Sequence, residues 1–99
     1  MSNYAKRVDA NQRTIVEFLR RAGFSVEHLH TQGKGCPDLL CGIAGKNFLI
    51  EIKDGKRKTA KLNELQEIWH STWKGKVSVI KNIDDCLKFI NKAKNINHE

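Results

Sequence analysis

The chain has 99 residues, the length of a single domain, and carries a formal net charge of +7 with a pI near 9.5. Such a charge favours a polyanionic partner such as nucleic acid, because bound phosphates release condensed counterions. The three cysteines, Cys36, Cys41 and Cys86, are odd in number and form no CxxC pair, which argues against a disulfide framework and predicts a cytosolic protein. No apolar run is long enough for a membrane span or a signal peptide, so we expect no membrane partner.

The first half of the chain predicts one helix and three strands. Apolar residues at helical spacing up to Ala22, followed by Gly23, predict an amphipathic helix over residues 9–22. A strand over residues 25–30 and a glycine-rich loop over 31–37 come next. Two more strands, over residues 38–43 and 47–53, surround a short turn segment and predict a hairpin.

The second half begins with a basic loop over residues 54–61. Asn63, with Gln66 three residues later, has the pattern of a capping box and predicts a helix that ends at Gly75. Leu65, Trp69 and Trp73 share one face of this helix, which predicts that they are at least partly in the core.

A fourth strand over residues 77–80 and a helix after Asn82 complete the predicted domain, residues 1–92, and residues 93–99 read as a polar tail. The order is helix, three strands, helix, strand, helix (αβββαβα). If the strands on either side of the middle helix are parallel neighbours, an α/β domain results, with a mixed four-stranded sheet flanked by helices.

The hairpin contains the residues best suited to catalysis or metal binding. Side chains alternate along a strand, so Glu51 and Lys53 share one face while the apolar residues between and before them share the other. A two-residue turn at residues 45–46 would place Asp38 opposite Lys53 and on the face of Glu51. A three-residue turn without a bulge would place Asp38 on the other face.

Glu51 interrupts an apolar run that is typical of a central strand, where an unpaired carboxylate costs several kcal/mol. A bound metal ion or a lysine partner would offset that cost. We expect Asp38, Glu51 and the backbone carbonyl of Ile52 to hold Mg²⁺, or Mn²⁺ in its place. Lys53 would then orient or deprotonate the attacking water, or stabilise charge in the transition state. The plainer alternative is a turn aspartate beside an exposed Glu51–Lys53 pair.

Three segments carry a resemblance to a known family: Gly-Cys-Pro-Asp at residues 35–38, Glu-Ile-Lys at 51–53 and Leu-Asn-Glu-Leu-Gln at 62–66. Together they resemble the PD-(D/E)XK nuclease superfamily, and most closely its VRR-NUC branch, which is common in phages and bacteria. The likeness runs from residue 12 to residue 90. It implies a restriction-endonuclease-like core, also found in archaeal Holliday junction resolvases, in the cytosol of a bacterium or of a phage-infected host.

The resemblance also implies roles for single residues. Asp38 and Glu51 would bind metal, Lys53 would serve the nucleophile and Gln66 would support the site, although Gln66 could also act only in its capping box. Many members carry a metal-binding Glu on the first helix. The matching position here is Gln12, a poorer ligand because it is neutral, with Asp9 as a possible substitute.

Several basic and polar residues near this site are candidates for contact with DNA. Lys34 lies in the glycine-rich loop, and His30 and Thr31 precede it. The loop after Lys53 adds Lys56, Arg57, Lys58 and Lys61, which could equally be a solvated charged surface.

The sequence therefore predicts a Mg²⁺-dependent endonuclease acting on branched DNA, such as four-way junctions, or on duplex DNA. One site per chain must pair with another to cut two strands, so we expect a homodimer, with Trp73 as a contact if it is exposed. One alternative is a basic DNA- or RNA-binding module without catalysis, in which Asp38 and Glu51 form internal hydrogen bonds. Another is an interaction subunit of a phage DNA-processing complex whose basic face meets an acidic partner.

Overall fold

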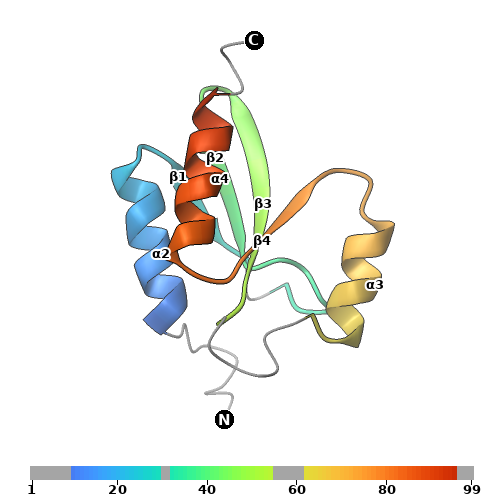
Figure 1. Cartoon of the computed structure of the whole chain (residues 1–99). Coiled ribbons are helices and arrows are strands. Elements are labelled where there is room, and N and C mark those ends of the chain that lie inside the picture. Colours follow the sequence, from blue (N-terminus) through green and yellow to red (C-terminus); the bar gives the residue numbers. More distant parts are fainter. Residues whose placement is uncertain (1–9, 30–31, 55–61, 96–99) are drawn as a thin grey trace.

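The computed structural model of the chain describes residues 10–29, 32–54 and 62–95. Within these ranges four strands form one mixed sheet in the order β1-β2-β3-β4, flanked by three helices (Figure 1). The predicted α/β class, with a mixed four-stranded sheet and flanking helices, is confirmed. The elements are α2 (Ala10–Arg21), β1 (Ser25–His28), β2 (Leu39–Ile43), β3 (Lys46–Ile52), α3 (Glu64–Thr72), β4 (Val77–Ile80) and α4 (Ile83–Asn95).

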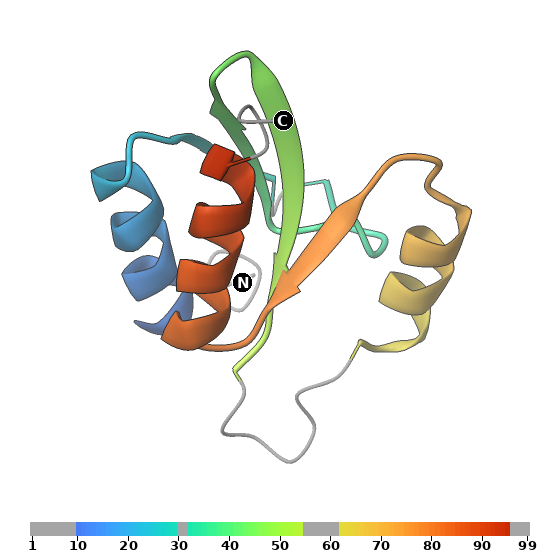
Figure 2. The same ribbon diagram turned by 45° about the horizontal axis from the view of Figure 1, so that its top comes forward.

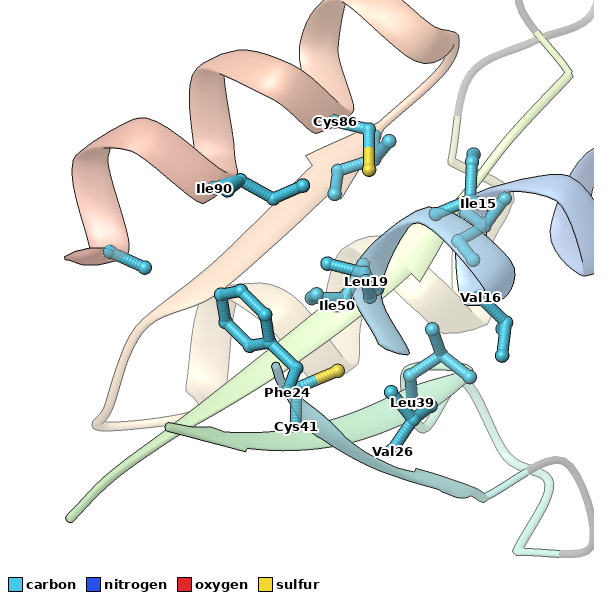
Figure 3. Packing of buried hydrophobic residues seen from close by; sticks show 13 residues of the cluster. Ile15, Val16, Leu19, Phe24, Val26, Leu39, Cys41, Ile50, Cys86 and Ile90 are labelled. Atoms are coloured by element: carbon cyan, nitrogen blue, oxygen red, sulfur yellow. The ribbon is translucent and has the colours of Figure 1, made fainter. Parts of the chain in front are cut away.

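The sheet separates two unequal layers. Helices α2 and α4 lie side by side against one face, and α3 lies beyond the other face (Figures 1 and 2). Apolar side chains of α2, α4 and the facing side of the sheet form the buried core, among them Ile15, Leu19 and Ile50 (Figure 3). No residue of α3 is buried. The α3 side of the sheet is therefore the open side.

The β2–β3 hairpin has a two-residue turn at Ala44 and Gly45. Ile43 pairs with Lys46, and both turn residues have positive φ, 53° and 79°, the pattern of a type I′ turn. The register continues to Leu39 opposite Ile50, so the next position sets Asp38 opposite Glu51. The predicted turn at residues 45–46, with Asp38 opposite Lys53, is therefore wrong by one turn position. Moving a two-residue turn by one position changes the residue opposite Asp38 by two positions. Side chains alternate with a period of two, so Asp38 stays on the same face as Glu51 for any such turn.

Strands β3 and β4 are parallel neighbours joined through α3, as predicted. Glu51 pairs with Val79 and Ile52 with Ile80, and the N–H of Lys53 donates to the carbonyl of Ile80 at 3.0 Å. The crossover returns the chain to the sheet directly beside the carboxyl end of β3. The α3 segment is thereby positioned over the face that carries Glu51.

Helix α4 extends through Asn95, which corrects the predicted polar tail from residue 93. Ala93 is 3% exposed and belongs to the core, since Cys86, Ile90 and Ala93 recur at helical spacing on one face. A small apolar residue completes that face where the sequence reading expected only polar chain. No helix in the described ranges is long and apolar enough to cross a membrane.

Candidate active site

Asp38 and Glu51 face each other at the end of the hairpin. The N–H of Lys53 points to β4, and the N–H of Ile52 points the other way, to the Oδ2 atom of Asp38 at 2.8 Å. This alternation makes the Asp38–Glu51 position a non-hydrogen-bonded pair, at which the side chains of antiparallel neighbours approach most closely. Leu29 donates its N–H to the Asp38 carbonyl at 2.7 Å and fixes the backbone from the other side. The predicted meeting of the two carboxylates is what the structure shows.

Glu51 is 1% exposed and has an unusual environment for a carboxyl group. Burial and then the charge of Asp38 raise the pKa of Glu51 from its ordinary value of 4.5 to about 8, while the charge of Lys53 lowers it. A hydrogen bond to Asp38, which requires the proton, raises the pKa further. In the ionised form, the buried Oε1 atom of Glu51 has no hydrogen-bond donor in the described part of the chain. This pair of carboxyls therefore needs either a shared proton or a cation.

The donors gathered here suit a hard divalent cation. Two carboxylates from adjacent strands supply oxygen ligands of the type that Mg²⁺ and Mn²⁺ prefer. The carbonyl of Ile52 points to the same side of β3 as its N–H, toward Asp38, so it is available as a third oxygen. The described residues contain no group of three or more His, Cys, Asp or Glu side chains that could hold a metal. The residues present fit a cation that keeps water molecules among its ligands.

Lys53 lies next to the carboxylates, and His70 lies near Lys53. The Nζ atom of Lys53 is 3.9 Å from the Oε2 atom of Glu51, and the lysine side chain is 19% exposed. Burial and then the charge of Lys53 lower the pKa of His70, so the imidazole lies near the ammonium group of Lys53. Its Nε2 atom is buried without a hydrogen-bond partner among the described residues. Sequence reasoning missed His70, although it follows Gln66 by four residues and so shares its helix face.

The side-chain amide of Gln66 uses its oxygen to cap α3 and its nitrogen to bind Glu51. Its Oε1 atom accepts the N–H of Asn63 at 3.0 Å, and its own N–H donates to the Asn63 side chain at 2.9 Å, which completes the predicted capping box. The Nε2 atom donates to the Oε2 atom of Glu51 at 2.8 Å. The capping box fixes which end of the amide is the acceptor, so the donor end must face the carboxylate. Both predicted contacts of Gln66 are therefore present at once.

Gly35 lets the loop before Asp38 lie against α3. A Cβ atom at Gly35 would clash with the carbonyl oxygen of Leu65 and lie 2.7 Å from its carbonyl carbon. The φ of Gly35 is +86°, which other residues rarely adopt. The loop that delivers Asp38 and the helix that delivers Gln66 are thus in backbone contact, and only glycine permits it.

Helix α2 reaches this end of the sheet through Asn11. The Nδ2 atom of Asn11 donates to the carbonyl of Lys53 at 2.9 Å. Gln12 is buried, as its place on the apolar stripe predicts, and its Nε2 atom is 3.3 Å from the Nδ1 atom of His28. His28 pairs with Leu39, on the core face of the sheet, whereas Glu51 faces the other side. A metal-binding role for Gln12 stays a prediction, and sequence reasoning missed the contact of Asn11.

The predicted DNA-contact residues are only partly described. Lys34 is exposed on the loop that leads to Asp38, with a positive φ of 54°. The other candidates and one metal candidate lie outside the described residues: His30, Thr31, Lys56, Arg57, Lys58, Lys61 and Asp9.

The predicted core role of the α3 face is wrong in part. Leu65 is 58% exposed, as Ile68 is 53%, and Trp73 is 47% exposed, whereas Trp69 is half-buried. Leu65 packs through its backbone against Gly35 rather than through its side chain into a core.

Together these contacts make a site with paired acids, a nearby cation and an amide support, of a kind suited to metal-assisted hydrolysis. Comparison with family models, with curated proteins and with solved structures finds no match to this chain.

Proposed function

We propose that this chain is a metal-dependent endonuclease that hydrolyses DNA phosphodiester bonds and has a restriction-endonuclease-like core. One observation carries the proposal: Asp38 and the buried Glu51 face each other, and one oxygen of Glu51 has no hydrogen-bond donor among the residues that the structure describes. Ionising two facing carboxyls, one of them buried, is costly even with Lys53 nearby, since the pKa of Glu51 stays raised, and a divalent cation between them offsets the cost. The PD-(D/E)XK resemblance leads independently to the same residues.

The residues divide the work of hydrolysis as follows. Asp38, Glu51 and the Ile52 carbonyl would hold Mg²⁺ or Mn²⁺, which supplies Lewis-acid polarisation of the phosphate and a more acidic water. Lys53 stands 3.9 Å from Glu51, where its ammonium group orients the attacking water and stabilises charge that develops on the phosphate. Gln66 holds Glu51 in place through its 2.8 Å hydrogen bond.

The substrate proposal rests on charge and on the resemblance. A net charge of +7 supports binding to the phosphate backbone, and recognition by backbone and shape fits a single small domain better than base readout. The resemblance favours branched DNA such as four-way junctions. Cutting two strands requires two sites, so we propose a homodimer as the working form.

A cleavage assay tests the proposal. Four-way junction, flap, duplex and single-stranded DNA are incubated with the protein in Mg²⁺, in Mn²⁺ or in EDTA. We expect cleavage of at least one substrate with metal and none in EDTA, and loss of cleavage in Asp38→Asn and Glu51→Gln. Glu27→Gln, which changes an exposed carboxylate on β1, is the matched control and should cleave normally. Intact DNA in all metal conditions, with folded protein bound to it, would contradict the enzyme.

The raised pKa of Glu51 favours one rival, a basic DNA- or RNA-binding module without catalysis. With a pKa of about 8, Glu51 can keep its proton near neutral pH and share it with Asp38, without a metal. Titration with Mn²⁺ separates the two: the nuclease binds the ion at this pair and the module does not. A protein that binds neither metal nor nucleic acid would leave the interaction-subunit alternative.

A further inference from the structure

A groove runs along the open face of the sheet, between α3 and the hairpin. Its volume is about 450 Å³, within the range of sites that hold a small organic ligand. Cys36 lines one end of the groove. Burial and then the charges of Glu51 and Asp38 raise the pKa of the Cys36 thiol, so this end is near the carboxylate pair. The remaining lining residues are Leu29, Leu40, Asn47, Phe48, Leu49, Trp69, Trp73, Gly75 and Lys76.

The other end of the groove carries a stacked pair of indoles. The rings of Trp69 and Trp73 are 4.6 Å apart between centroids and 16° from parallel. Trp73 is the more exposed of the two, at 47%. Its backbone N–H donates to the carbonyl of Trp69 at 3.0 Å, and its indole lies so close to Gly75 that a Cβ atom there would be 2.9 Å from its Nε1 atom. The two indoles form an aromatic surface at this end of the groove.

We propose that this groove takes an unpaired nucleobase of the DNA strand, stacked on Trp73, with the neighbouring phosphates held by Lys74 and Lys76. Both lysines are exposed, and Lys76 lines the groove itself. Aromatic rings with adjacent cations are how proteins hold single-stranded nucleic acid without reading its sequence. An acidic peptide would use the cations but would not need stacked indoles. A second copy of the chain, at +7, would bring like charge to the two lysines, so the proposed homodimer pairs through another surface.

The position of Trp73 relative to Gln66 sets the substrate class, and this step rests on the proposed function. The two residues are two helical turns apart, about 10 Å along α3 at 1.5 Å per residue. A strand whose phosphate lies at Glu51 can therefore reach Trp73 with a nearby base. Such a base must be unpaired, because bases inside a duplex are covered on both faces by their neighbours. The inferred substrate is DNA with unpaired bases beside the cut, as in a flap or single strand, rather than continuous duplex.

Binding measured without metal tests the groove separately from catalysis. Fluorescence anisotropy in EDTA compares a labelled oligo-deoxythymidine with an oligomer of the same length that carries only abasic sites. We expect Trp73→Ala to weaken binding of the thymidine oligomer about 5- to 100-fold, and Trp73→Phe to weaken it less, because a stacked ring is retained. Binding of the abasic oligomer should be unchanged. Leu87→Ala, at an exposed apolar position on α4, should bind both oligomers normally.

Two results would overturn this inference. Equal binding of the thymidine oligomer by Trp73→Ala and the parent chain would exclude stacking. Sedimentation of the parent as a dimer that Trp73→Ala converts to a monomer, with DNA binding unchanged, would assign the groove to a second copy. Neither result bears on the metal site, which is tested by cleavage in Mg²⁺ or Mn²⁺.

Discussion

The side-chain amide of Gln66 donates a hydrogen bond to Glu51 and at the same time caps helix α3. Its oxygen accepts the N–H of Asn63 at 3.0 Å, and its nitrogen donates to Glu51 at 2.8 Å. The start of a surface helix is thereby coupled to a buried carboxylate of the central strand. Because α3 has no buried residue of its own, this hydrogen bond and the Gly35 contact are what connect it to the site.

Gln66→Glu should separate capping from support of Glu51. Glutamate at this position still accepts the N–H of Asn63, but it replaces the donor to Glu51 with a third carboxylate beside Asp38 and Glu51. Above pH 8, where Glu51 is ionised, we expect a loss of about 1–3 kcal/mol in the free energy of unfolding, measured in urea with EDTA. Asn63→Ser, which keeps a capping oxygen, should cost much less. A Gln66→Glu protein as stable as the parent would show that the hydrogen bond to Glu51 contributes nothing.

Gly35→Ala should destabilise the protein more than Gly33→Ala does. Both glycines have positive φ, +86° and +66°, so both substitutions carry a backbone cost of about 1–2 kcal/mol. Only the Cβ at Gly35 meets α3, whereas that at Gly33 meets open space. We expect urea unfolding to show at least about 1 kcal/mol of additional loss for Gly35→Ala, as is usual for an overpacked contact. Equal losses would mean that the loop and α3 separate without cost.

The sequence predicts that Asp38 and Glu51 share one face of the hairpin, because this depends on strand alternation and not on the exact position of a two-residue turn. Glu51 interrupts an apolar run, and strand alternation assigns it to the face of Lys53. The turn was misplaced because a type I′ turn favours asparagine or aspartate before glycine, and here Ala44 takes the first positive φ. The error moved the partner of Asp38 by two residues and so kept its face.

The placement of α3, and of His70 with it, could not be predicted from the sequence, although the resemblance did assign Gln66 to the site. The helical spacing of Leu65 and Trp73 resembles that of a core-facing stripe, yet these side chains are 58% and 47% exposed. The helix is positioned by a backbone contact at Gly35 and a polar contact at Glu51, neither of which leaves an apolar pattern. His70 joins the site only through that placement.

The metal-free protein should lose stability as pH rises from about 4.5 to about 8. The pKa of Glu51 is raised to about 8 when folded, so in this window the folded chain keeps a proton that the unfolded chain releases. Stability then falls with pH, because the folded state binds more protons. The contribution is complete below 4.5 and gone above 8. Urea unfolding in EDTA should show this decline in the parent and not in Glu51→Gln. A parallel pH profile for the two proteins would show that Glu51 titrates normally.

Mn²⁺ should stabilise the protein through the same carboxylates. A ligand that binds only the folded state adds about 2.7 kcal/mol at one hundred times its dissociation constant. Asp38→Asn and Glu51→Gln should lose this gain, and Glu27→Gln should keep it. Because the cation replaces a proton on Glu51, we also expect calorimetry to record proton release and an affinity that rises up to about pH 8. The same stabilisation in all three variants would place the ion elsewhere.

Lys53→Met should separate metal binding from hydrolysis. The ammonium group is 3.9 Å from Glu51, and its charge lowers the pKa of that carboxyl, so its removal raises the pKa further. Measured above pH 8, where Glu51 is ionised in the parent, binding of Mn²⁺ should be largely retained. DNA cleavage under single-turnover conditions should fall about 10²- to 10⁴-fold, as expected when a group that positions or activates water is lost. Lys81→Met removes an exposed lysine just after β4 and provides the matched change in net charge. If both variants cleave at the same rate, Lys53 acts only as a surface charge. If Lys53→Met also loses Mn²⁺ binding, Lys53 keeps the carboxylates able to bind metal and does not act on the attacking water.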